Sequence, residues 1–167
     1  MPEPTMTPDL RVSGQRREPS PRGWPVLAVI SAGGVVGGVA RHGVTEVLGG
    51  PPGGFPWATF AINVSGCLLI GLLMVLLSEV WTGRRLLRPF LGVGVLGGFT
   101  TFSTYVVDIQ GTVAAGSPGV ALLYLAATVV GALVAVWVGA LVAGWIVAAV
   151  TARAARARRA SRGPVAR

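Results

Sequence analysis

The sequence GGFTTFSTY, residues 97–105, lies inside an apolar run that extends from about Pro89 to Val107. Adjacent glycines weaken a helix, and Thr and Ser hydroxyls can bond to backbone carbonyls. We therefore predict a membrane helix that breaks near the middle of the bilayer. Because lipid cannot satisfy the backbone groups that such a break releases, the broken segment has to pack in protein, line a watery cavity or hold an ion.

The composition of the 167-residue chain is that of a membrane protein, because 52% of its residues are hydrophobic and only 12% are charged. We expect an all-α membrane protein with four transmembrane helices, the third of them broken. The first three spans match the ~20 residues that cross a bilayer, and the fourth is long enough to tilt or extend past it. The predicted transmembrane channel domain covers residues 24–150, and its spans lie at about 24–44, 57–77, 89–107 and 119–150.

The two ends of the chain are basic. Residues 1–23 are rich in Pro and Arg and are predicted to form a disordered N-terminal tail, and residues 151–167 form a basic C-terminal tail. All 14 basic residues are arginines, and the net charge is +8. We expect no nucleic-acid binding, because no aromatic residues alternate with the tail arginines. Tails of this kind lie in solvent or against membrane lipid.

Asn63 is the polar anomaly of the second span. An amide inside a bilayer is costly unless it is paired, so Asn63 either bonds to another helix or offers its NH₂ group to an anion. Thr59 and Gly66 share a helix face with it. In the fourth span, Tyr124 and Thr128 place two hydroxyls on one face; the alternative is a Tyr anchored at the interface and a Thr bonded to its own backbone.

Small residues recur at a spacing of four in two spans, which is typical of closely packed membrane helices. The first span contains the pairs Gly33/Gly37 and Gly34/Gly38, and Arg41 follows the first pair one turn later. Arg41 either extends to the membrane interface or places a cation at a pore mouth. The stripe in the fourth span consists of Gly131, Ala135, Gly139 and Ala143.

The stretch at 97–105 closely resembles the signature of the fluoride channels known as CrcB or Fluc. The segments 33–42 and 59–66 resemble the first and second helices of that family, and the resemblance covers roughly residues 24–150. It implies an antiparallel dimer that acts as a fluoride-selective channel. Such a channel lowers cytoplasmic fluoride by passive export across the plasma membrane.

The resemblance also implies the roles of individual residues. Tyr105 occupies a position where the family usually has Phe. A structural Na⁺ at the dimer interface would bind the backbone carbonyls of Gly97 and Thr100 together with two carbonyls of the partner. The implied pore residues are Asn63, Phe102, Ser103, Thr104, Tyr105, Tyr124 and Thr128, with Arg41 and Thr59 in the pore vestibule.

Two other functions remain open at this stage. A small four-span proton-coupled exporter needs a titratable carboxylate within the membrane, and we place none of the acidic residues in the middle of a span. A non-conducting partner subunit would explain the small-residue stripes but not the polar residues. We expect no enzyme, because the chain has one His, one Cys and no carboxylate pair.

Arginine placement predicts the orientation of the chain. Four spans put both termini and the second loop on one side, and this side holds 13 arginines against one, Arg41, on the other. By the positive-inside rule, both termini are expected in the cytoplasm. An antiparallel dimer would then need an oppositely oriented homologous subunit. The alternative is a homodimer whose subunits insert in both directions despite the tails.

Overall fold

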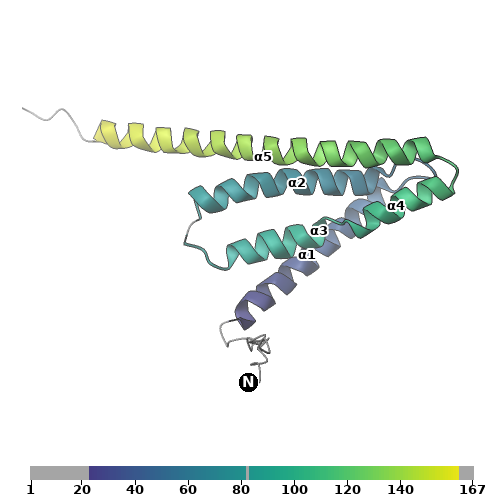
Figure 1. The fold of residues 1–167 in the computed structure, drawn as a ribbon. Coiled ribbons are helices and arrows are strands. Elements are labelled where there is room, and N and C mark those ends of the chain that lie inside the picture. Colours follow the sequence, from purple (N-terminus) through teal and green to yellow (C-terminus); the bar gives the residue numbers. More distant parts are fainter. Residues whose placement is uncertain (1–22, 82, 162–167) are drawn as a thin grey trace, which may run out of the picture.

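The computed structural model describes residues 23–81 and 83–161, and within these ranges all regular structure is helical. The tail predicted for residues 1–23 therefore lies, apart from Gly23, outside the described residues. In Figure 1, α2 and α5 run side by side, and α1 crosses η1 and α3. The elements are α1 (Trp24–Leu48), α2 (Trp57–Glu79), the π-helix η1 (Pro89–Leu96), α3 (Gly97–Phe99), α4 (Ser103–Ala114) and α5 (Pro118–Ser161).

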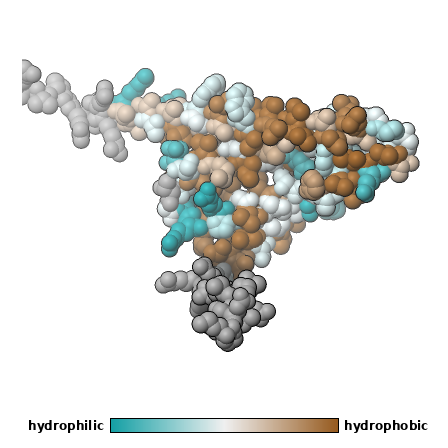
Figure 2. Space-filling view, in the orientation of Figure 1, coloured by the Kyte–Doolittle hydropathy of each residue, from teal (hydrophilic) through white to brown (hydrophobic). Residues whose placement is uncertain are grey.

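Four helical segments of the described chain are long and apolar enough to cross a membrane: Trp24–Leu48, Trp57–Glu79, Pro89–Ala114 and Pro118–Arg156. Large hydrophobic side chains cover the outer faces of these helices, as the brown surface of Figure 2 shows. Such a surface is expected of helices that face lipid rather than water. The prediction of an all-helical protein with four candidate spans is therefore confirmed.

The third helical segment ends later than the sequence suggested. The predicted third span ends at about Val107, whereas α4 continues to Ala114 and includes Asp108. The Thr112 hydroxyl donates to the Asp108 carbonyl oxygen at 2.7 Å, so the side chain adds to the helical bonds. The helix ends at Ala114, shortly before Gly116, whose φ of 80° is readily adopted only by glycine.

The fourth helix also extends beyond its predicted span. α5 continues past Val150 to Ser161, so most of the predicted C-terminal tail is a continuation of this helix. Ala and Arg dominate this segment, and both are strong helix formers. Figure 1 shows the end of α5 projecting past the end of α2.

Glycines set the distances between the packed helices. A Cβ atom on Gly37 would collide with the Val95 carbonyl oxygen of η1. Between α2 and α5, a Cβ on Gly139 would collide with the Leu68 carbonyl oxygen. The predicted packing role of Gly37 and Gly139 is confirmed, whereas a Cβ on Gly38 would meet open space.

Candidate functional site

The third helical segment is interrupted between α3 and α4. Thr100 is extended, with φ −76° and ψ 155°, and helical geometry resumes in α4. The Thr101 N–H donates to Asn63 Oδ1 and Asn63 Nδ2 donates to the Thr101 carbonyl oxygen, each at 2.9 Å. The amide of Asn63 on α2 therefore satisfies both backbone groups of one residue in the interruption.

These bonds change the surroundings of the two carbonyls predicted to bind Na⁺. In a continuous α-helix, the Gly97 carbonyl would accept from the N–H of Thr101, which here donates to Asn63. The Thr100 carbonyl would accept from the N–H of Thr104, which here donates to the Thr101 hydroxyl at 3.2 Å. Both carbonyls have thus lost their usual helical donors, and both residues line the same hollow.

Thr101 is the residue that the sequence analysis missed. Its buried hydroxyl accepts from the Thr104 N–H and donates to the Thr104 hydroxyl at 3.0 Å. A Thr that caps the N–H three residues later is a common signal at the start of a helix. The Thr-x-x-Thr spacing of residues 101 and 104 could therefore have identified the beginning of α4.

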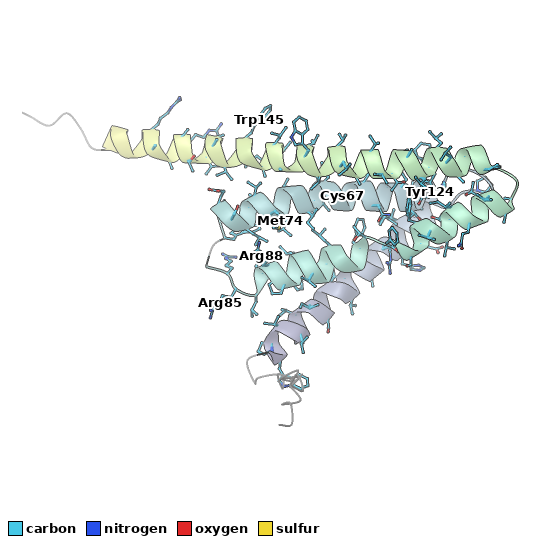
Figure 3. The ribbon with its side chains drawn as sticks, in the orientation of Figure 1. Cys67, Met74, Arg85, Arg88, Tyr124 and Trp145 are labelled. Carbon is cyan, nitrogen blue, oxygen red and sulfur yellow. The ribbon has the colours of Figure 1, made fainter. Side chains whose placement is uncertain are left out.

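A groove of about 390 Å³ runs along the interruption. Its walls are formed by residues of α2, of α5 and of the segment from η1 to α4. It brings together four of the predicted pore residues, namely Asn63, Phe102, Tyr105 and Thr128. Cys67, labelled on α2 in Figure 3, also contributes to its wall. The Thr128 side chain is buried, and its hydroxyl has no hydrogen-bond partner within the described part of the chain.

The two aromatic residues of the signature have different environments. Phe102 is 78% exposed, and its ring centroid lies 6.0 Å from that of Tyr105. Tyr105 is buried, and its hydroxyl donates to the Leu125 carbonyl oxygen of α5 at 3.0 Å. The Tyr105 hydroxyl therefore connects α4 to α5, while the Phe102 ring remains available to a ligand.

Tyr124 is fully buried and does not line the groove. Its hydroxyl donates to Asp108 Oδ2 at a long 3.4 Å. Its ring lies between those of Tyr105 and Phe55, with centroid distances of 5.2 and 5.4 Å. Figure 3 shows Tyr124 near the turn between α4 and α5, where this aromatic cluster joins α4, α5 and the loop before α2.

The remaining predicted site residues lie elsewhere. Thr59 and Thr104 line a second hollow of about 380 Å³, together with Asp108 and the Gly- and Pro-rich loop before α2. Ser103 is exposed and Arg41 is half-buried, and they line neither of these two hollows. Six of the nine predicted pore and vestibule residues thus line one of these two hollows, and Arg41, Ser103 and Tyr124 line neither.

Comparisons with known proteins identify relatives over most of the chain. Residues 28–140 match the family described as "CrcB-like protein, Camphor Resistance (CrcB)". The fluoride-specific ion channel FluC 2 of Streptomyces avermitilis is 53% identical over 119 residues, which are 71% of this chain and 75% of the relative. FluC 1 of Streptomyces coelicolor is 51% identical over 122 residues, 71% of this chain and 79% of the relative.

A second protein of Streptomyces avermitilis, FluC 3, is 52% identical over 83 residues, which are 50% of this chain and 41% of the relative. One organism therefore carries two such relatives. Together with its four apolar helices, the family match makes the chain a multi-pass membrane protein.

Proposed function

Since the chain belongs to the CrcB family, we propose that it is a subunit of a fluoride-selective channel that lowers cytoplasmic fluoride by passive export. The observation that carries this proposal is that Thr128, whose buried hydroxyl lacks a partner among the described residues, lines the same groove as the exposed Phe102 ring. The names of the relatives, all fluoride-specific ion channels, give independent support.

Fluoride binds its water tightly, so a pore has to replace that water with hydrogen-bond donors. Asn63 gives one N–H to the Thr101 carbonyl, which leaves the second N–H of its NH₂ group for an anion. Thr128 supplies a hydroxyl, and the positive edge of the Phe102 ring can approach an anion directly. The three side chains share one groove, so a single ion can pass among them.

Passive transport fits the groove better than proton coupling does. A proton-coupled exporter needs a carboxylate along its path. The residues that line the groove include no Asp or Glu. Asp108 lies within α4, but it lines the second hollow and accepts a hydrogen bond from Tyr124.

A structural Na⁺ is part of this proposal. The carbonyls of Gly97 and Thr100 would hold the ion, because hard cations prefer oxygen ligands and both carbonyls have lost their usual helical donors. Two carbonyls from one chain are too few for such an ion. An antiparallel partner would bring the second pair, so the ion would stabilise the dimer interface.

The charge distribution favours a partner of different sequence. With 13 arginines on the side of the termini and one on the other, this chain is expected to insert in one orientation, with both termini in the cytoplasm. An oppositely oriented homologue would complete the antiparallel dimer. Two FluC relatives in one Streptomyces species agree with such a pair. A homodimer with dual insertion is the competing arrangement, and a non-conducting role within a heterodimer is the alternative function.

Transport in liposomes tests the function. The purified chain, with and without a co-expressed homologue, is reconstituted into vesicles loaded with potassium fluoride or chloride, and efflux is followed with ion-selective electrodes after valinomycin is added. We expect fluoride efflux and retained chloride. Thr128→Val, which removes the hydroxyl and keeps the shape, should slow fluoride.

Thr151→Val is the matched control, because the Thr151 hydroxyl on the same helix bonds to its own backbone. It should leave efflux unchanged. Equal passage of chloride and fluoride would contradict the proposed selectivity, and normal efflux from Thr128→Val would contradict the role of the groove.

Cysteine labelling tests the orientation. In a chain with Cys67 replaced by Ser, single cysteines are introduced at Gly50, before α2, and at Gly83, after α2. Each reports on which side of the membrane its loop lies, and both positions have open space for a side chain. Fixed insertion predicts that an impermeant reagent labels Gly50→Cys from outside the cell and Gly83→Cys only after lysis. Equal labelling of each site from both sides would establish dual insertion.

A further inference from the structure

Two adjoining hollows lie at the end of the molecule where α2 connects to η1, and Trp81 forms part of both. The first, of about 200 Å³, is lined by Leu77, Ser78, Trp81, Arg84, Arg85 and Arg88. The second, of about 230 Å³, has only apolar side chains from α2, η1 and Trp81: Leu69, Leu72, Leu73, Leu76, Trp81, Leu91, Val95 and Leu96. We call them the arginine pocket and the leucine groove.

The arginine pocket concentrates positive charge that the protein itself does not neutralise. All three of its arginines are exposed, and within residues 23–81 and 83–161 no ion pair joins any of them to a carboxylate. Figure 3 shows Arg85 and Arg88 beside the loop between α2 and η1. Guanidinium groups bind phosphate with paired N–H donors, so three of them around one hollow suit a phosphate group.

The leucine groove gives the site its second property. It lies between two helical segments that are apolar enough to span a membrane, so its lining suits an apolar chain. Trp81 lies where the groove meets the arginine pocket, and Trp is enriched at the boundary between lipid tails and headgroups. Figure 2 shows hydrophilic side chains gathered at this end of the molecule beside the apolar surface of the helices.

We propose that the arginine pocket and the leucine groove together bind one anionic phospholipid. The phosphate lies among Arg84, Arg85 and Arg88, and an acyl chain lies along the leucine groove past Trp81. A soluble phosphate would use only the arginines, whereas the shared wall of the two hollows suits a molecule with a charged head and an apolar tail. The arginine pocket shares no residue with the groove at the interruption, and the leucine groove shares only Leu96 with it.

Native mass spectrometry of the purified full-length protein with defined lipids tests this site without reference to fluoride transport. Phosphatidylglycerol and phosphatidylcholine with identical acyl chains are added in competition. We expect the protein to retain phosphatidylglycerol preferentially. The triple variant Arg84→Gln/Arg85→Gln/Arg88→Gln should lower that preference by about tenfold or more, because each arginine near a lipid headgroup contributes to the attraction.

Arg153→Gln/Arg156→Gln is the control for net charge. These exposed arginines lie on the part of α5 that projects at the same end, outside both hollows. This variant should keep most of the preference, and excess inorganic phosphate should fail to displace the bound lipid. An equal loss in both arginine variants, or displacement by phosphate alone, would overturn the proposal.

A second pair of variants tests the leucine groove. Leu69→Trp fills the groove, and Met74→Trp adds the same bulk to a side chain of α2 that is equally 45% exposed but lines neither hollow. Phosphatidylglycerol retention should fall severalfold for Leu69→Trp and stay unchanged for Met74→Trp. If Leu69→Trp retains the lipid as the unmodified protein does, the acyl chain does not occupy this groove and the proposal fails.

Discussion

The two sides of α2 hold their neighbours by different means. Towards α5, Gly71 packs against the Val136 carbonyl, and Gly139 of α5 packs against the Leu68 carbonyl. Towards the interruption, the Asn63 side chain bonds to the backbone of Thr101. One side uses the absence of side chains to bring two backbones together, and the other uses a side chain to replace a missing helical bond.

This difference separates the structural frame from the proposed ion path. Helices that pack through glycine keep their own backbone bonds, so the α2–α5 contact positions the helices without offering polar groups to a ligand. The interruption does the reverse, because the bonds to Asn63 and Thr101 redirect two N–H donors away from the carbonyls of Gly97 and Thr100. Substitutions on the two sides should therefore fail in different ways.

The largest effect is expected from Gly139→Ala. The new Cβ would collide with the Leu68 carbonyl, and a backbone atom cannot move aside as a flexible side chain can. We expect the free energy of unfolding to fall by about 3 kcal/mol, with loss of transport as a consequence. Thermal unfolding in detergent measures the change.

Gly144→Ala on the same helix is its control, because a Cβ there would meet open space. Its melting temperature should stay close to that of the unmodified protein. Equal stability of Gly139→Ala and Gly144→Ala would show that the α2–α5 contact does not depend on the close approach of the two backbones.

Asn63→Ala should destabilise the backbone at the interruption and leave the packing of α2 against α5 intact. It removes the two hydrogen bonds that Asn63 makes to the N–H and carbonyl of Thr101. We expect the free energy of unfolding to fall by about 1–2 kcal/mol. Fluoride efflux from liposomes should slow strongly while the elution volume in size-exclusion chromatography stays unchanged. Ser65→Ala is the matched control, since the Ser65 hydroxyl bonds only to its own helix; normal efflux from Asn63→Ala would remove Asn63 from the path.

The four helices were predictable from the sequence, but the contacts at the interruption were not. Hydropathy is a local property, so the four apolar helices and the packing position of Gly139 on α5 were predictable from residue spacing, whereas Gly71 of α2 was not singled out. The partner of Asn63 was not, because Thr101 is 38 positions away and the bond depends on how α2 packs against the interruption. The depth of this interruption in the bilayer stays a prediction.

Asp108 and Tyr105 each make a contact that residue spacing did not predict. The predicted third span ended before Asp108, yet this residue lies in α4, where its carboxylate accepts a hydrogen bond from Tyr124. Tyr105 lines the groove, and its hydroxyl donates to the Leu125 carbonyl of α5. Both outcomes depend on the packing of α4 against α5, which residue spacing alone does not determine.

Phe102→Ala should affect the ion path alone. The side chain is 78% exposed, so its removal should change the free energy of unfolding by no more than about 0.5 kcal/mol. Fluoride efflux should still fall severalfold, because the ring edge at the groove is lost. Trp145→Ala removes an aromatic ring that is 76% exposed on α5, away from the groove, and should conduct normally; equal efflux from both variants would exclude Phe102 from the path.

The smallest effect is expected from Tyr105→Phe, which tests whether the contact between α4 and α5 belongs to the frame or to the ion path. The hydroxyl donates to the Leu125 carbonyl, which as part of α5 also has a helical donor, so its loss should cost only about 0.6 kcal/mol. The ring, which packs against Phe102 and Tyr124, is retained.

Fluoride efflux from Tyr105→Phe should therefore equal or exceed that of the unmodified protein, measured alongside its melting temperature. Thr112→Val is a suitable comparison, because it removes one buried hydroxyl from the same helix whose bond stays within that helix. The contrary result is that Tyr105→Phe loses most of its efflux while its melting temperature matches that of Thr112→Val. In that case the Tyr105 hydroxyl contacts the ion directly, and it belongs to the ion path rather than to the contact between α4 and α5.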